Sequence, residues 1–172
     1  KFSDNKTEEN GGAIENGLGG EIRINQCEFI DNDTKDQGGA IFNRGRLIIN
    51  NSEFRQNTSV VGCGGSIKNN VEGKIELKNN TFANNTSDMG GGAISNEGHI
   101  KIENNSFLNN NGFCQLLVDA IPSIFNGNGA TAFAVGNYRD GFTAVTTERK
   151  QKSIQFFIIG FNGLNDIFFA FR

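Results

Sequence analysis

The sequence has few of the residues on which common catalytic and metal sites depend. Among its 172 residues are one histidine and three cysteines. With His99 as the single histidine, no Ser-His-Asp or Cys-His arrangement can be proposed with a partner nearby in the sequence. The cysteines, Cys27, Cys63 and Cys114, have neither Cys-x-x-Cys nor Cys/His spacing. Their odd number and spacing argue against a disulfide framework and a zinc site, although one pair could still form a disulfide. We therefore expect no metal and no cofactor.

An excess of positive charge and a long hydrophobic run are also missing. Sixteen lysines and arginines stand against 19 aspartates and glutamates, which gives a net charge of −3 spread along the chain. Without a basic stripe, nucleic acid is not an expected partner. No apolar run reaches the roughly 18 residues of a membrane helix, so we expect no transmembrane segment. The chain begins at Lys1 in what reads as the second half of a repeat, and we expect it to be a fragment of a longer repeat protein.

Glycine and asparagine, by contrast, are abundant. The chain has 23 glycines, and asparagine is frequent as far as Asn111. Both residues adopt left-handed and turn conformations at low cost. The composition therefore predicts many sharp turns between short strands, and it argues against long helices.

A repeated unit runs through residues 1–112, with a period of about 26 residues that is typical of solenoid proteins. One half of the unit is Gly-Gly-Ala-Ile, with serine in place of alanine in the third copy, and the other half is Phe-x-x-Asn. An alternating apolar pair lies between the two halves, which indicates a strand with one buried face. The Gly-Gly-Ala-Ile blocks occupy residues 11–14, 38–41, 64–67 and 91–94, and the Phe-x-x-Asn blocks begin at Phe2, Phe29, Phe54, Phe82 and Phe107.

This repeat predicts an all-β fold, a right-handed, single-stranded parallel β-helix with three short strands per coil. No piece between two corners is long enough for an interposed helix, which needs roughly 10 to 12 residues. Coils stacked about 4.8 Å apart place equivalent residues above one another, so the isoleucines and phenylalanines should form continuous internal columns. Asparagines at the corners should adopt a left-handed backbone and bond to the same amide one coil away.

The repeat stops at residue 113, and residues 113–172 are rich in phenylalanine. We predict a short helix at 114–125, interrupted near Pro122, followed by strands at 131–135, 142–146, 154–161 and 167–171. This segment is expected either to cap the open end of the solenoid or to continue it as degenerate coils. The sequence leaves both alternatives open.

Few outward positions carry a pattern typical of chemistry. Glu28 and Glu53 should stack on adjacent coils, where paired carboxylates could bind a cation or take part in acid–base chemistry. Their column continues with threonine and serine, no basic column matches it, and we predict no catalytic residue. The outward column that contains Arg46, Lys74 and His99 is interpreted as a solvated face.

The stretches between each Phe-x-x-Asn and the next Gly-Gly differ in length and composition, as outward loops do. We therefore predict that a partner contacts these loops. The residues singled out are Asp33, Lys35, Asp36, Val60, Val61, Asp88 and Met89.

The paired motif resembles the repeats of the polymorphic outer membrane proteins, the chlamydial-type autotransporter adhesins. The resemblance covers Phe2 to about Asn110. It implies an extracellular or cell-surface passenger, possible at an outer membrane, that adheres to a protein or glycan of a host or neighbouring cell. We therefore expect a non-enzymatic binding scaffold. The alternatives are a carbohydrate-active β-helix enzyme, a polysaccharide lyase or hydrolase that would use Glu28 and Glu53, and a structural spacer in a filament or multidomain surface protein.

Overall fold

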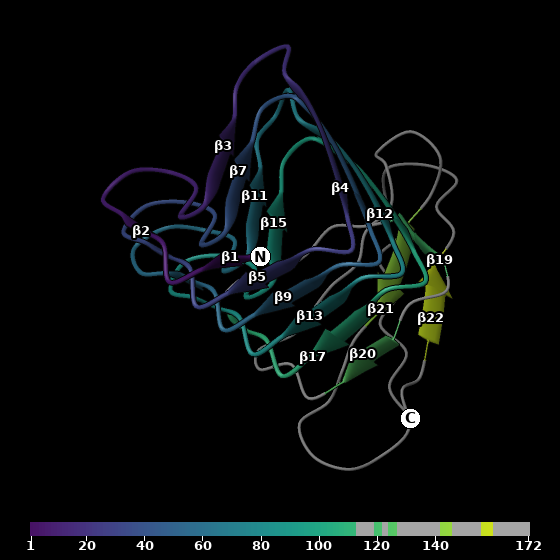
Figure 1. Cartoon of the computed structure of the whole chain (residues 1–172). Coiled ribbons are helices and arrows are strands. Elements are labelled where there is room, and N and C mark those ends of the chain that lie inside the picture. The colour runs from purple at the N-terminus through teal and green to yellow at the C-terminus, as the bar shows by residue number, and fades with distance from the viewer. Residues whose placement is uncertain (113–118, 122–123, 127–141, 146–155, 160–172) are drawn as a thin grey trace.

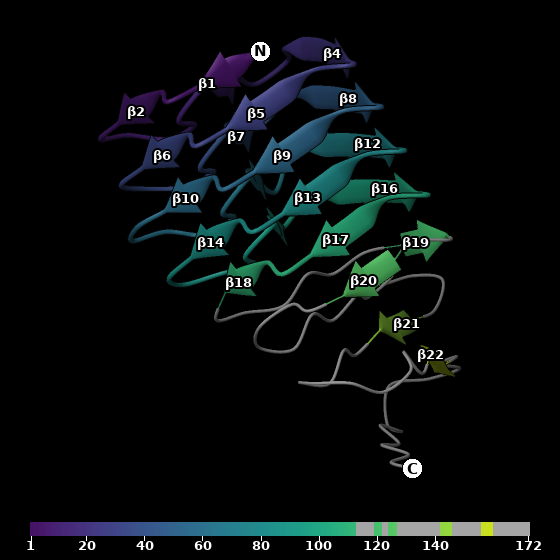
Figure 2. The same ribbon diagram turned by 60° about the horizontal axis from the view of Figure 1, so that its bottom comes forward.

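The computed structural model describes residues 1–112, 119–121, 124–126, 142–145 and 156–159. All secondary structure in these residues is β-strand. Residues 1–112 wind into a parallel β-solenoid whose stacked coils are seen nearly end-on in Figure 1 and from the side in Figure 2. The predicted all-β solenoid is therefore confirmed, and one coil corresponds to one sequence repeat.

Four parallel sheets, named A to D here, form the walls of the solenoid. Sheet A holds the phenylalanines and consists of β1 (Phe2–Ser3), β5 (Glu28–Ile30), β9 (Glu53–Arg55), β13 (Thr81–Ala83), β17 (Ser106–Leu108) and β20 (Ile124–Asn126). Sheet B consists of two-residue strands, β2 (Lys6–Thr7), β6 (Asp33–Thr34), β10 (Thr58–Ser59), β14 (Thr86–Ser87) and β18 (Asn111–Gly112). Sheet C follows the Gly-Gly corner and consists of β3 (Ile14–Asn16), β7 (Ile41–Asn43), β11 (Ile67–Asn69) and β15 (Ile94–Asn96). Sheet D has the longest strands, β4 (Glu21–Asn25), β8 (Arg46–Asn50), β12 (Lys74–Lys78), β16 (His99–Glu103) and β19 (Asp119–Ile121).

Each complete coil thus has four strands, and the prediction of three was wrong. The strand that the sequence did not reveal is the two-residue strand of sheet B. Thr34, Ser59 and Ser87 on these strands are polar but buried, so the strand lacks the alternation of apolar and polar residues that marks a half-buried strand. It forms because the chain pairs with its neighbouring coils before it turns outward.

The registers place equivalent repeat residues side by side, as predicted. Ile41 pairs with Ile14 and Ile67, and Phe54 pairs with Phe29 and Phe82. The five phenylalanine rings form a stack with centroid separations of 4.7, 4.6, 4.8 and 5.0 Å along the axis. Burial of each such side chain contributes about 1.5 to 3 kcal/mol, so the free energy of unfolding grows with each added coil.

Asparagine amides also form ladders inside the solenoid. Along the ladder that contains Asn57, each Nδ2 donates to the Oδ1 one coil on, over 2.7, 2.8, 2.9 and 2.8 Å. A second ladder, which contains Asn43 in sheet C, has the equivalent distances of 2.7, 2.7 and 2.6 Å. In the ladder of Asn57 the left-handed residue is the one before the asparagine, for example Gln56 with φ 55° and Asn84 with φ 56°. In an exposed ladder that contains Asn51, Asn79 and Asn104, the asparagine itself is left-handed and its amide also bonds to the adjacent coil, as predicted.

Beyond residue 112, β19 and β20 remain parallel to the preceding coil. The predicted helix at 114–125 is wrong where these strands lie. Phe125 pairs with Phe107, so the phenylalanine register of sheet A continues across a connection that is much shorter than the repeat. β21 (Phe142–Val145) and β22 (Phe156–Ile159) form an antiparallel pair within two of the predicted strands. The strands predicted at 131–135 and 167–171 lie outside the described residues.

Candidate functional site

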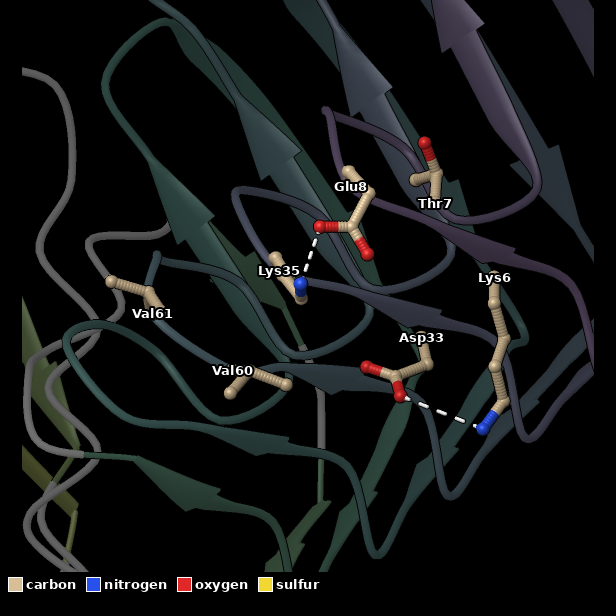
Figure 3. Close-up of a pocket in the computed structure, with 7 residues that line it drawn as sticks. All are labelled: Lys6, Thr7, Glu8, Asp33, Lys35, Val60 and Val61. Atoms are coloured by element: carbon tan, nitrogen blue, oxygen red, sulfur yellow. Dashed lines mark ion pairs between the residues drawn. The ribbon is translucent and has the colours of Figure 1, made fainter.

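The outward loops between sheets B and C form a groove that spans three consecutive coils. Its volume is about 490 Å³. Seven side chains line it, and Figure 3 shows them converging from neighbouring coils. They are Lys6, Thr7, Glu8, Asp33, Lys35, Val60 and Val61. We call this hollow the loop groove.

The parallel register brings these residues together from distant parts of the chain. Lys6 of β2 lies opposite Asp33 of β6, which in turn lies opposite Thr58 of β10. Beyond the strands, the backbone N–H of Lys35 donates to the carbonyl of Thr7 over 3.1 Å. The N–H of Val61 donates to the carbonyl of Lys35 over 3.0 Å. Backbone hydrogen bonds therefore hold the first residues of each loop against the next coil.

Two ion pairs cross between the first and second coils at the groove. Lys6 Nζ lies 3.9 Å from Asp33 Oδ2, and the Lys35 ammonium pairs with the Glu8 carboxylate (Figure 3). All four side chains are partly or largely exposed to solvent, so each pair is worth at most about 1 kcal/mol. The two positive and two negative charges balance, which makes the charged side of the groove neutral in sum.

The opposite side of the groove is apolar. Val60 and Val61 are 41% and 61% exposed, and on the next coil Met89 is 61% exposed. Exposed aliphatic side chains that gather on adjacent loops are typical of contact surfaces. The loop groove therefore combines a charged side that supplies hydrogen bonds with an apolar side that supplies contact area.

Four of the seven predicted partner-binding residues, Asp33, Lys35, Val60 and Val61, line the groove. The other three, Asp36, Asp88 and Met89, are exposed on the same set of loops but do not line it.

The prediction missed the residues of the first coil, Lys6, Thr7 and Glu8. The signal was present, because Phe2-x-x-Asn5 places Lys6 in the register of Asp33. The first copy of the motif, Phe2-x-x-Asn5, therefore predicts an outward loop at Glu8 like those of the later coils.

Glu28 and Glu53 are neighbours in register, as predicted. No basic column accompanies them, because the positions equivalent to Arg55 on the adjacent coils are Ile30 and Ala83. Arg55 itself lies on the same face two residues after Glu53, and its Nε is 2.8 Å from Glu53 Oε1, although this N–H makes no hydrogen bond. Arg55 thus places a positive charge beside one of the two carboxylates.

Metal ligands, cysteines and membrane-spanning helices were the other features considered. Among the described residues, no group of three or more histidine, cysteine, aspartate or glutamate side chains could hold a metal ion. Cys27 and Cys63 are free thiols. Within the described part of the chain no helix is both long and apolar enough to span a membrane.

The sequence of one coil matches a known repeat. Residues 81–97 match the family model of the Chlamydia polymorphic membrane protein repeat. The matched segment runs from β13 to just past β15, so it contains one Phe-x-x-Asn block and one Gly-Gly-Ala-Ile block. No curated protein and no solved structure matches the chain. The other coils carry the same blocks in the same register. The chain is therefore a parallel β-solenoid that is similar, over residues 81–97, to the repeat of the Chlamydia polymorphic membrane proteins, and this similarity points to a surface protein.

Proposed function

We propose that the chain is a non-enzymatic, surface-exposed or secreted scaffold that binds a protein or glycan of a host or neighbouring cell through the loop groove. One observation carries the proposal: Val60 and Val61 are exposed together at the edge of a groove built by three coils. Exposed apolar side chains that lie together beside a hollow are a feature of contact surfaces, and a partner would cover them.

The division of the coil into constant and variable parts supports this proposal. The repeated isoleucines, phenylalanines and asparagines point inward and form the core and the ladders. At the groove, equivalent positions change from coil to coil, for example from Lys6 to Asp33 to Thr58. Change at positions that are not needed for folding is what a specific contact surface requires.

The backbone beneath the groove favours a preformed site. The N–H of Val60 donates to the carbonyl of Thr34 over 2.9 Å, so the apolar side begins at a residue held by the sheet. A site that is ordered before binding loses little conformational entropy when the partner docks. An apolar side next to a charged side also gives the mixture of apolar and polar area that protein contact surfaces have.

The test is attachment of beads coated with the full chain to a panel of cells, with and without the substitutions Val60→Asp and Val61→Asp. Two carboxylates on the apolar side of the groove should lower attachment at least about tenfold, since loss of an apolar anchor of a contact surface costs about 2 kcal/mol or more. Val71→Asp is the matched control, because Val71 is 62% exposed at the corner between sheets C and D, away from the groove. Equal loss in both variants, or no loss in either, would contradict the proposal.

Two alternatives are separated by a parallel assay. A carbohydrate-active enzyme predicts depolymerisation of a polysaccharide that disappears in Glu28→Gln or Glu53→Gln. We expect no turnover in the unaltered chain, because Arg55 neutralises Glu53. A purely structural spacer predicts neither turnover nor attachment.

A further inference from the structure

The outer face of sheet D carries a column of basic side chains that the loop groove does not use. Arg46, Lys74 and His99 begin β8, β12 and β16 and lie directly opposite one another on three adjacent coils. Lys101 lies two residues after His99 and faces the same way. All four side chains are exposed. We call these four residues the cation column.

The acidic residues of this face pair with Arg46 but form no ion pair with Lys74 or Lys101. Arg46 Nη2 is 2.9 Å from Glu76 Oε1, and Lys78 Nζ is 2.7 Å from Glu103 Oε1. These pairs use both carboxylates on the two strands concerned. In the described part of the chain, the ammonium groups of Lys74 and Lys101 then have no carboxylate within 4.0 Å.

The positive charge of Lys101 acts on the neighbouring carboxyl group of Glu103. The pKa of the Glu103 carboxyl is lowered first by its hydrogen bond and charge interaction with Lys78, and Lys101 lowers it further. Lys101 also has acidic neighbours in register, Glu76 on one side and Asp119 on the other, but forms no ion pair with Glu76. The lysine is thus close to acidic residues without being held by one.

This arrangement differs from the rest of the surface. On strands β4, β8, β12 and β16 the outward positions hold five lysines and arginines and three glutamates, while the whole chain carries −3. Arg46 and Lys74 are like charges that lie opposite one another, and an anion laid along them reduces their repulsion. A local excess of positive charge in an acidic chain therefore indicates a ligand that is itself negative.

We propose that the cation column binds a linear anionic polysaccharide, which lies along the solenoid axis across β8, β12 and β16. Successive basic side chains are about one strand spacing, roughly 4.8 Å, apart along this axis. A chain with regularly placed sulfate or carboxylate groups can therefore contact several of them at once. Each contact is weak by itself, and their number supplies the affinity.

Two other polyanions fit this face less well. The outward positions of β4, β8, β12 and β16 hold no phenylalanine, tyrosine or tryptophan, and His99 is their one ring on which a base of single-stranded nucleic acid could stack. The exposed large apolar residues, among them Leu18, Val61 and Val71, all lie outside these strands. Ile48 is the one apolar residue at an outward position of the face and is partly buried, which gives a membrane surface little to insert into. A polysaccharide needs neither feature.

The experiment measures the affinity of the full chain for heparin at several salt concentrations. The variant Lys74→Gln/Lys101→Gln should bind at least about fivefold more weakly. Its slope of log Kd against log salt should fall by about 1 to 2, because two fewer counterion-releasing contacts remain. The control Lys6→Gln/Lys35→Gln makes the same change in net charge at the loop groove and should bind as the unaltered chain does. Circular dichroism melting checks that both variants stay folded.

Several results would overturn the proposal. They are no heparin binding at low salt, equal loss in the two lysine variants, and binding of single-stranded DNA or of anionic lipid vesicles as tight as that of heparin. The cation column lies on sheet D and the loop groove lies beside sheet B, so the proposal for each site can be refuted without affecting the other. Val60→Asp/Val61→Asp should keep heparin binding, and Lys74→Gln/Lys101→Gln should keep the cell attachment that depends on the groove.

Discussion

Replacement of Asn57 by alanine should destabilise the solenoid more than any exposed change of the same size. Asn57 is fully buried. Its Nδ2 donates to the carbonyl of Phe29 over 3.0 Å and to Asn85 Oδ1 over 2.9 Å. Its Oδ1 accepts the backbone N–H of Asn32 over 3.1 Å and the Nδ2 of Asn32 over 2.8 Å. The substitution therefore removes four hydrogen bonds that join three coils.

The size of the effect follows from what is left behind. The buried N–H of Asn32 loses its acceptor, and an orphaned buried group costs about 1 to 3 kcal/mol. Some of the other groups keep a partner: Asn32 Nδ2 still donates to the carbonyl of Phe2 over 3.2 Å, and Asn85 Oδ1 still accepts the N–H of residue 57 over 3.0 Å. The three remaining bonds should therefore cost about 0.5 to 1 kcal/mol each, and we expect the free energy of unfolding to fall by about 4 kcal/mol.

Urea unfolding followed by far-ultraviolet circular dichroism measures this change. The matched control is Asn25→Ala, because Asn25 belongs to an exposed asparagine ladder and accepts a single bond from Asn51 Nδ2, over 2.9 Å. It should change the free energy of unfolding by less than about 0.5 kcal/mol. If the two variants unfold at the same urea concentration, the buried ladder does not stabilise the fold and the reasoning is refuted.

Two further predictions concern the coil corner and the charged face. In Gly39→Ala the new Cβ would lie 2.0 Å from the backbone oxygen of Gly65 in the next coil, so the midpoint of thermal unfolding should fall sharply. The control Gly17→Ala should leave this midpoint unchanged, because no atom lies within 4 Å of the added Cβ. Equal midpoints would show that the coils separate easily. Lys78→Gln should raise the pKa of Glu103 towards its ordinary value, as followed by NMR titration, because Lys78 lowers it. A lowered carboxyl pKa adds stability above the ordinary pKa that is lost as the pH falls, so the variant should lose less on acidification. An unchanged pKa would mean that the pair does not form in solution.

The core could be predicted from the sequence because the same apolar residues recur at the same positions of each repeat. A residue that recurs at a constant offset in each coil must stack on its copies, and Ile41, Phe54 and Asn57 do so. The fourth strand escaped prediction because it has only two residues and a buried polar side chain such as Ser59. The register of Phe125 was hidden because the connection before it is shorter than the repeat.

The loop groove could be predicted only in part. Variable loop length identified Val60 and Val61 as exposed, but sequence offsets do not say which outward side chains meet. The partners of Lys6 and Lys35 lie one coil away, at Asp33 and Glu8, and such contacts depend on side-chain direction and loop path. The contact of Arg55 with Glu53 is different, because both residues lie on one face of β9 and their spacing of two could have indicated it.

The sequence by itself determined the solenoid, its coil length, the columns of its core and its asparagine ladders, because identical residues at a fixed period have one way to bury their side chains together. The sequence also placed Arg46, Lys74 and His99 in one outward column, but only the tertiary structure decided which outward side chains pair and which stay unpaired, both in the loop groove beside sheet B and in the cation column on sheet D. The physical reason is that outward positions carry no repeat. Their charges and apolar groups form ion pairs and contact surfaces only when the stacking of the coils places them a few ångströms apart.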